Sequence, residues 1–116
     1  MEIENAVELL AALGHASRLA VFRLLVEAGP QGLHASAIAA QLAMAPATLS
    51  FHLAHLSRVG LIRGQRASRF IHYSANYESV DGLIAFLTQN CCQGSPCLTT
   101  TACCTPADRP ETMQNV

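Results

Sequence analysis

Lysine is absent from the whole chain, and cysteine is absent from its first 90 residues. The formal net charge is −1, which taken alone argues against a nucleic-acid-binding protein. No uninterrupted apolar run approaches the ~20 residues that a membrane helix needs. The N-terminal stretch `MEIENAVELL` has acidic side chains but no basic one, which is the wrong composition for an export signal. We therefore expect a cytoplasmic protein.

Catalytic motifs are also missing. The chain has no glycine-rich phosphate loop and no pair of carboxylates at a useful spacing. Serine, histidine and aspartate occur in no order that suggests a catalytic triad. The sequence therefore predicts that this protein is not an enzyme.

Acidic residues are missing from the middle of the chain, between residues 45 and 75. The same segment carries four arginines: Arg58, Arg63, Arg66 and Arg69. A local basic patch matters more to a polyanion than the total charge does. This segment is therefore the expected site of nucleic-acid binding.

Helical periodicity predicts two amphipathic helices in the first 30 residues, and Gly29-Pro30 ends the second. Their apolar faces carry Ile3, Val7, Leu10 and Leu13 in the first helix and Leu19, Phe22 and Val26 in the second.

A helix-turn-helix is predicted next. A short helix over residues 35–42 is followed by a tight turn and by a second helix that opens at Pro46 and ends at Gly60. Its apolar stripe is Leu49, Leu53 and Leu56.

Residues 61–75 then predict two short strands around a turn near Arg66 to Ser68, and residues 77–89 predict a last helix. A basic hairpin beside a helix-turn-helix is a wing that can follow phosphates. The fold class is therefore mainly α with a β-hairpin wing: a winged helix-turn-helix of about five helices.

The outer face of the helix that opens at Pro46 is the expected DNA-reading surface. Phe51 suits a thymine methyl group, and Thr48 or Ser50 suits a base edge or a phosphate. His52 lies toward the core side, and we expect it to be a structural histidine whose hydrogen bonds are satisfied. The full set of DNA-binding candidates is Ala47, Thr48, Ser50, Phe51, His55, Arg58, Arg63, Arg66 and Arg69.

All five cysteines follow Asn90, where periodicity stops and Cys, Thr, Pro, Gly and Ser dominate. We therefore divide the chain into a DNA-binding and dimerisation domain, residues 1–90, and a flexible cysteine-rich tail, residues 91–116. Because cytosolic thiols stay reduced, a metal, a metalloid or redox chemistry is favoured over a disulfide framework.

The cysteines leave several kinds of site open. Cys91, Cys92 and Cys97 suit a thiophilic ion such as As(III), which needs three sulfurs on one side. A fourth sulfur from Cys103 or Cys104 would instead satisfy tetrahedral zinc. A redox sensor would pair Cys91 or Cys92 with Cys97 or the distal cysteines, and an incidental tail would bind nothing. Cys103 and Cys104 are either accessory or incidental.

Three stretches resemble one family over about residues 5–89. `LGHASRLAVFRLL` resembles the second helix of the ArsR/SmtB winged helix-turn-helix regulators, `PATLSFHLAHLSRVGLI` looks like their recognition helix, and `GQRASRFIHYSA` is similar to their wing. The resemblance implies a homodimeric repressor that binds operator DNA and leaves it when a metal or metalloid binds. It also implies that the first and last helices form the dimer interface.

Two departures from the family pattern narrow the range of possible inducers. `LHASAIAAQL` lacks the cysteines that many arsenic sensors of the family carry, and `YESVDGLIAFL` lacks the histidine of the zinc sensors. `NCCQGSPC` resembles members that bind As(III) through a C-terminal Cys-Cys pair and a third cysteine. The resemblance therefore implies an As(III)-responsive repressor, with Sb(III) or methylated arsenic as other inducers. A zinc- or cadmium-responsive repressor and a thiol-based redox regulator are the alternatives.

Overall fold

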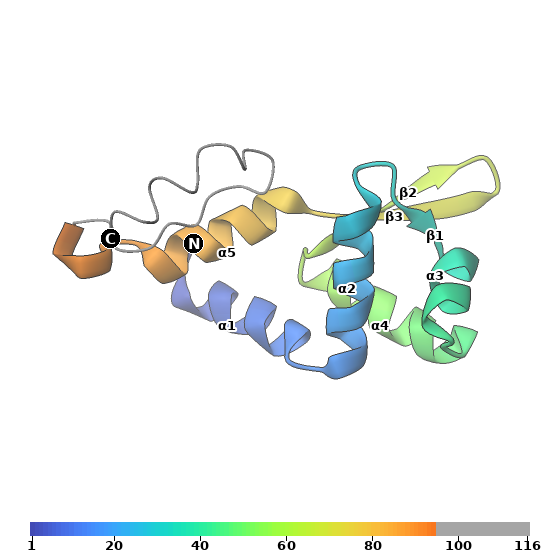
Figure 1. Ribbon diagram of the computed structural model, residues 1–116, viewed down its shortest axis with the longest axis horizontal. Helices are drawn as coiled ribbons and strands as arrows, with labels where there is room; N and C mark the ends of the chain where they lie inside the picture. Colours follow the sequence, from blue (N-terminus) through green and yellow to red (C-terminus); the bar gives the residue numbers. More distant parts are fainter. Residues whose placement is uncertain (95–116) are drawn as a thin grey trace, which may run out of the picture. The chain divides into compact units, whose positions relative to one another are not determined.

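The structure is a computed structural model that describes residues 1–94 of the 116-residue chain (Figure 1). The chain divides into two units, and the boundary between them falls between Ile84 and Ala85. The helices are α1 (Ile3–Leu13), α2 (Ala16–Ala28), α3 (Ala35–Leu42), α4 (Pro46–Arg58) and α5 (Tyr77–Thr88), followed by a 3-10 turn, Cys91–Gly94. The strands are β1 (Leu33–His34), β2 (Ile62–Ala67) and β3 (Phe70–Ala75).

Helices α3 and α4 form the predicted helix-turn-helix, and their axes bend by 115° at the turn. Ala43 closes α3 in the left-handed conformation with φ of 52°, and the amide of Met44 donates to the carbonyl of Ala39 over 3.0 Å. Pro46 opens α4, where its missing N–H costs nothing. The turn therefore places α4 as a separate helix on the surface of the domain.

The core of the first unit lies where α4 packs against α2 and α3. Leu49, Leu53 and Leu56 are buried as predicted, and Leu25 of α2 and Ile38 of α3 are fully buried as well. Burying each of these side chains contributes about 1.5–3 kcal/mol. The buried stripe holds α4 by one face and leaves the opposite face to solvent.

The wing is a three-stranded antiparallel sheet in the order β1-β3-β2. The sequence predicted two strands and missed β1, which pairs Leu33 with Tyr73 and His34 with His72. The hairpin register pairs Ala67 with Phe70, so its two-residue turn is Ser68-Arg69 and Arg66 lies within β2. Ser68 has φ of 62°, as such tight hairpin turns require.

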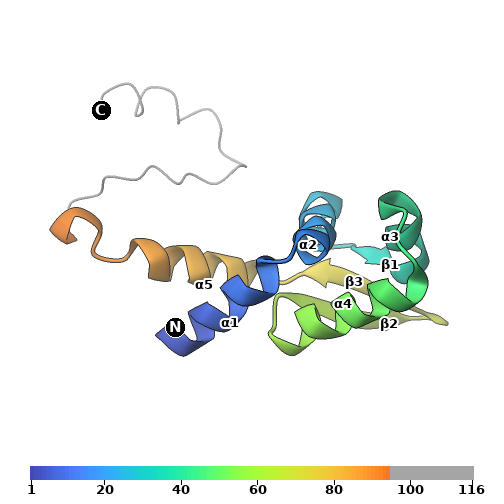
Figure 2. The same cartoon turned by 90° about the horizontal axis from the view of Figure 1, so that it is seen from below.

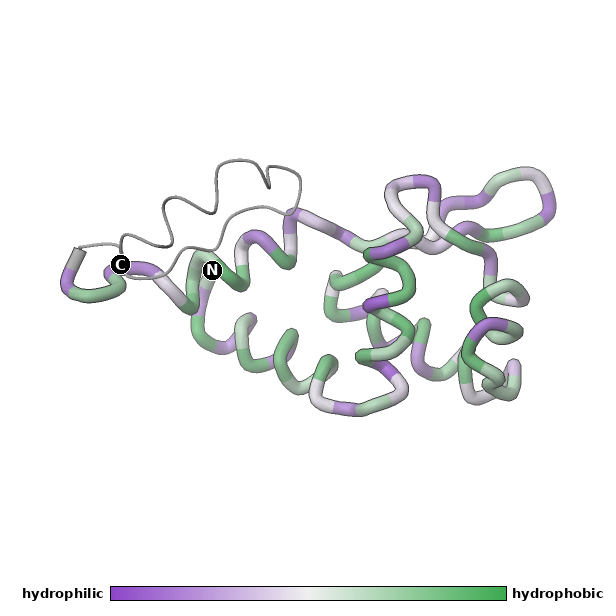
Figure 3. The backbone as a smooth tube through the Cα atoms, viewed as in Figure 1, coloured by the Kyte–Doolittle hydropathy of each residue, from purple (hydrophilic) through white to green (hydrophobic). Residues whose placement is uncertain are grey.

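The buried faces of α1 and α2 differ from the apolar stripes singled out in the sequence. On α1 the buried residues are Ala6, Leu9 and Ala12, whereas Ile3, Val7 and Leu10 are 63%, 57% and 45% exposed. On α2 the buried residues are Val21, Phe22 and Leu25. In Figure 3 most of α1, the helix next to the N-terminus, has the green colour of hydrophobic residues. Helix α1 therefore has an inner and an outer apolar stripe.

Two side chains tie the start of α5 to the end of α4. Asn76 Nδ2 and Ser79 Oγ both donate to the carbonyl of Gly60, over 2.9 and 2.8 Å. The Tyr77 hydroxyl also donates to the carbonyl of Val26 over 3.2 Å. These bonds anchor the chain where it leaves the wing.

Among the described residues, none of the helices taken singly has the length and apolar character to cross a membrane. Two bent pairs, α1 with α2 and α3 with α4, meet the test on length and composition only.

Candidate nucleic-acid interface and cysteine pair

The outer face of α4 presents the predicted DNA-reading residues to solvent. Ala47, Thr48, Ser50 and Arg58 are exposed, and Phe51 is 66% exposed. His55 is half-buried, and burial lowers its pKa, with a further lowering by the positive charges of Arg18 and Arg58. At neutral pH this face therefore presents hydroxyls, one aromatic ring, a neutral imidazole and one cation.

His52 lies on the core side of α4, as predicted, and is only 5% exposed. Its ring centroid is 4.9 Å from that of His15, which caps α2 by accepting from the amide of Ser17. Within the described residues His52 Nδ1 has no hydrogen-bond partner. The expectation that the hydrogen bonds of this histidine are satisfied is therefore wrong. Burial lowers the pKa of His52, and His15, Arg18 and His55 lower it further.

The wing arginines have different surroundings. In Figure 2 the β2–β3 hairpin runs beside α4, and α4 packs on β2. Arg66 in β2 and Arg69 in the turn are exposed, and their side chains make no hydrogen bond or ion pair with the described residues. Both guanidinium groups are therefore available to phosphates.

Arg63, by contrast, is already engaged at the base of the wing. Its guanidinium donates to Asn76 Oδ1 over 2.8 Å and lies 3.6 Å from a carboxylate oxygen of Glu78. Both charged side chains are largely exposed, so the ion pair itself is weak. A phosphate contact by Arg63 would nevertheless have to compete with these partners.

The cysteine pair follows α5 directly. The sulfurs of Cys91 and Cys92 lie 3.5 Å apart, on a turn where Asn90, Cys92 and Gln93 have positive φ. Cys91 is a free thiol and half-buried, whereas Cys92 is disulfide-bonded. Cys97, Cys103 and Cys104 lie outside the described residues. No group of three His, Cys, Asp or Glu side chains that could hold a metal occurs within residues 1–94.

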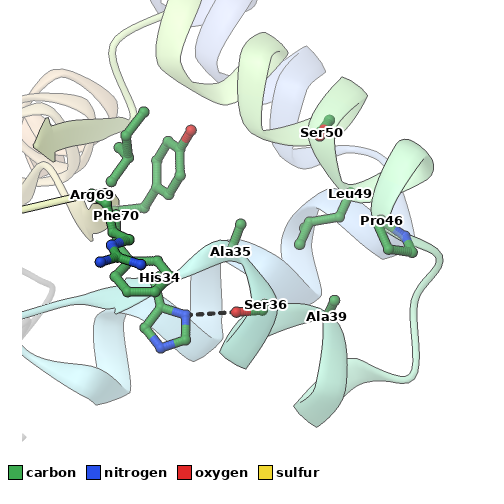
Figure 4. Close-up of a pocket in the computed structure, with 11 residues that line it drawn as sticks. His34, Ala35, Ser36, Ala39, Pro46, Leu49, Ser50, Arg69 and Phe70 are labelled. Carbon is green, nitrogen blue, oxygen red and sulfur yellow. Dashed lines mark hydrogen bonds between the residues drawn. The ribbon is translucent and has the colours of Figure 1, made fainter.

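A pocket that the sequence analysis missed lies between the wing, the start of α3 and the start of α4 (Figure 4). Its volume is about 590 Å³. Ser50 and Arg69, both DNA-binding candidates, line it together with His34, Leu49 and Phe70. The structure thus brings the recognition helix and the turn of the wing to one concave surface.

Three comparisons place this geometry among known proteins. Residues 13–65 match a family described as a helix-turn-helix domain. The HTH-type transcriptional regulator YgaV from Escherichia coli (strain K12) is 34% identical over 89 residues, which cover 77% of this chain and 88% of YgaV. Among solved structures, reduced HlyU from Vibrio cholerae N16961 is 28% identical with a TM-score of 0.61, covering 78% of this chain and 92% of HlyU.

The homodimeric winged helix-turn-helix DNA-binding domain of Mb0332 from Mycobacterium bovis, described as a possible ArsR-family regulator, shares the fold with a TM-score of 0.61. It is 20% identical and covers 84% of this chain and 90% of that domain.

The chain belongs to the ArsR family of winged helix-turn-helix transcriptional regulators.

Membership confirms the family resemblance and the predicted fold class. This ArsR-family protein is a DNA-binding transcriptional regulator and not an enzyme, as the missing catalytic motifs predicted. Its assignment to the arsenite-responsive members, and each residue of the DNA and cysteine sites, stay predictions.

Proposed function

We propose that this ArsR-family regulator is a cytoplasmic homodimeric repressor that leaves its operator when Cys91, Cys92 and Cys97 bind As(III). The observation that carries the proposal is the 3.5 Å separation of the Cys91 and Cys92 sulfurs. Sulfur bonds of about 2.3 Å to one ion put two ligand sulfurs about 3.3–3.8 Å apart. The pair is therefore spaced for one thiophilic ion.

The chemistry of the cysteines fits a metalloid. Three thiols give up their protons to the hydroxyl groups of arsenous acid, three sulfur–arsenic bonds replace three oxygen–arsenic bonds, and three waters leave. Cys92 must be reduced before it can take part. Sb(III) would use the same three sulfurs, whereas a monomethylated arsenic would need only Cys91 and Cys92. Cys103 and Cys104 are either accessory to this site or incidental.

Dimerisation is supported by the outer stripe of α1, which this chain alone leaves exposed. Ile3, Val7 and Leu10 lie at helical spacing, and exposed apolar clusters of this kind mark protein interfaces. The Mycobacterium bovis domain of the same fold is homodimeric. A symmetric dimer would present two recognition helices about 34 Å apart, one turn of DNA.

In the proposed complex α4 enters the major groove. Thr48, Ser50 and Phe51 would then meet base edges, while Arg58, Arg66 and Arg69 hold phosphates. Residues 1–90 would carry DNA binding and dimerisation, and residues 91–116 would carry the sensor. Binding at the cysteines would order the chain at the end of α5 and shift the subunits, which needs coupling of about 1–3 kcal/mol.

A thiol-based redox sensor is the second candidate, because Cys92 is disulfide-bonded. When two thiols form a disulfide they lose two electrons and two protons. These electrons and protons reduce one hydrogen peroxide to two waters. The HlyU structure is of a reduced form. In this reading the oxidised and reduced states of the tail would differ in operator affinity.

A ligand panel separates these functions. The operator is first selected from random duplex DNA, and its release is then titrated with arsenite, antimonite, monomethylarsenite, zinc, cadmium and peroxide. Native mass spectrometry of each sample reports the bound mass. A phosphine reductant keeps the thiols free in the metal and metalloid samples without binding arsenic, and it is removed before peroxide is added. Release by arsenite with one arsenic per subunit is expected. Release only by peroxide, with a loss of two mass units, would favour the redox function.

A further inference from the structure

The pocket between the wing and the helix-turn-helix has the dimensions of a small-molecule site. Ligand pockets usually enclose about 300–1,000 Å³, and this one measures about 590 Å³. It is formed by α3, the first turns of α4 and the β2–β3 hairpin. Its lining includes neither Cys91 nor Cys92, so a ligand here would need no contact with these thiols.

The walls of the pocket are apolar, and small side chains leave it open. Ala35 and Ala39 of α3 face the space where a larger residue would fill it. Leu49 and Phe70 form the opposing walls, and Phe70 stacks on the ring of His34 with a centroid distance of 5.2 Å. A ligand with a flat or extended apolar body fits between these surfaces.

The polar groups of the pocket favour an anion. His34 Nδ1 accepts from the amide of Ala37 over 3.3 Å and lies 2.9 Å from Ser36 Oγ, so the ring proton is on Nε2, which is a donor. Arg69 adds an exposed guanidinium without an ion-pair partner among the described residues. Among the described residues no acidic side chain lines the pocket, so a ligand carboxylate would meet the Arg69 guanidinium and no opposing charge.

We propose that this pocket binds a small organic monocarboxylate with an apolar body, an aromatic or medium-chain acid. The carboxylate pairs with Arg69, and the apolar body lies between Leu49 and Phe70. Because Ser50 and Arg69 also belong to the proposed DNA surface, the acid and the operator exclude one another. The acid would then be a second inducer that needs no cysteine.

Calorimetric titration of the full chain tests the site directly. Benzoate, octanoate and the neutral isostere benzamide are titrated into reduced protein without metalloid. We expect benzoate or octanoate to bind about tenfold more tightly than benzamide, because a charged hydrogen-bonded pair is lost in the amide. Operator DNA should weaken acid binding, and saturating acid should release the operator.

Two variants and one control locate the acid. Ala39→Leu fills the pocket and Arg69→Gln removes its cation, and each should weaken benzoate binding about tenfold. Arg23→Gln removes an exposed arginine of α2 that pairs with Glu27, outside the pocket, and should leave the affinity unchanged. Because Arg69 is exposed, its variant folds even if Ala39→Leu does not. Cys91→Ser should bind benzoate normally, so this proposal can survive failure of the arsenic response.

Three results would overturn the proposal. These are no heat of binding at millimolar acid, equal affinity for benzoate and benzamide, or unchanged binding by Arg69→Gln. If operator DNA perturbs the pocket residues and millimolar acid does not, the concavity belongs to the DNA surface and holds no acid.

Discussion

At the scale of single residues, the arginines of the wing differ in the side chains that they contact in the free protein. The guanidinium of Arg66 has no partner among the described residues, whereas that of Arg63 binds Asn76 and lies beside Glu78. A phosphate contact releases counterions and appears in the salt dependence of DNA binding. The two residues therefore form a matched pair for testing the wing.

Arg66→Ala should weaken binding to specific and random duplexes alike, and should reduce the slope of log affinity against log salt by about 1 per subunit. Arg63→Ala should change that slope less, because its guanidinium is shared with Asn76. Fluorescence anisotropy at several salt concentrations measures both. An unchanged slope for Arg66→Ala would remove the wing from the DNA interface.

His52 makes stability depend on pH. Because its pKa in the folded chain is lowered from 6.5, the unfolded chain takes up the proton first as pH falls. Its contribution is therefore complete above pH 6.5 and is lost as pH falls below that value. A buried nitrogen without a hydrogen-bond partner, such as His52 Nδ1, lowers the free energy of unfolding by about 1–3 kcal/mol. His52→Leu removes this nitrogen and the titrating ring, so the free energy of unfolding should fall less between pH 7 and pH 5 in the variant than in the wild type. Equal pH dependence in denaturant melts of both proteins would contradict this account.

At the scale of elements, β1 depends on one glycine. Gly32 has φ of 72°, and a Cβ there would collide with the carbonyl of Tyr73, whereas Gly29 has φ of 87° and open space around it. Gly32→Ala should lower the unfolding free energy by about 3 kcal/mol, from backbone strain plus the clash, and Gly29→Ala by about 1 kcal/mol from strain alone. Thermal and denaturant melts compare them. Similar losses in both variants would mean that β1 does not pack on β3 as described.

The helix-turn-helix was predictable because its signals are local. Pro46, Gly60 and the leucine spacing of α4 each act within a few residues. Strand β1 was missed because Leu33 and His34 become a strand only by pairing with Tyr73 and His72. The inner stripe of α1 was missed because the buried Ala6 and Ala12 are small and only weakly apolar. The more strongly apolar side chains of this helix lie on its outer face.

In the candidate site too, features set by local sequence were predictable and features set by distant contacts were not. The exposed face of α4 follows from its buried stripe, so the solvent exposure of Thr48, Ser50 and Phe51 could be deduced. The engagement of Arg63 could not, because Asn76 reaches it only across the hairpin. The pocket could not either, since it arises from small side chains where three elements meet.

At the scale of the whole molecule, the outer stripe of α1 should hold the dimer together. Val7→Glu places a charge within this apolar stripe and should shift the protein toward monomer, raising the dimer dissociation constant at least about tenfold. Asn5→Glu adds the same charge to α1 at an exposed position outside the stripe and should leave the dimer intact. Sedimentation velocity across a concentration series distinguishes the two. A dimeric Val7→Glu protein would place the interface elsewhere.

The central claim is that three sulfurs switch DNA binding, and single serine variants test it most directly. Arsenite-driven release of the selected operator is measured for each cysteine variant in phosphine-reduced buffer. Cys91→Ser, Cys92→Ser and Cys97→Ser should each stay on the operator, while Cys103→Ser and Cys104→Ser keep most of the response, because a short loop to Cys97 costs less ordering entropy. The wild-type protein should bind arsenite more slowly as pH falls, since the thiolate and not the thiol is the nucleophile. If Cys97→Ser responds normally while Cys103→Ser or Cys104→Ser does not, or if saturating arsenite leaves the wild-type protein on its operator, the proposed sensor is wrong.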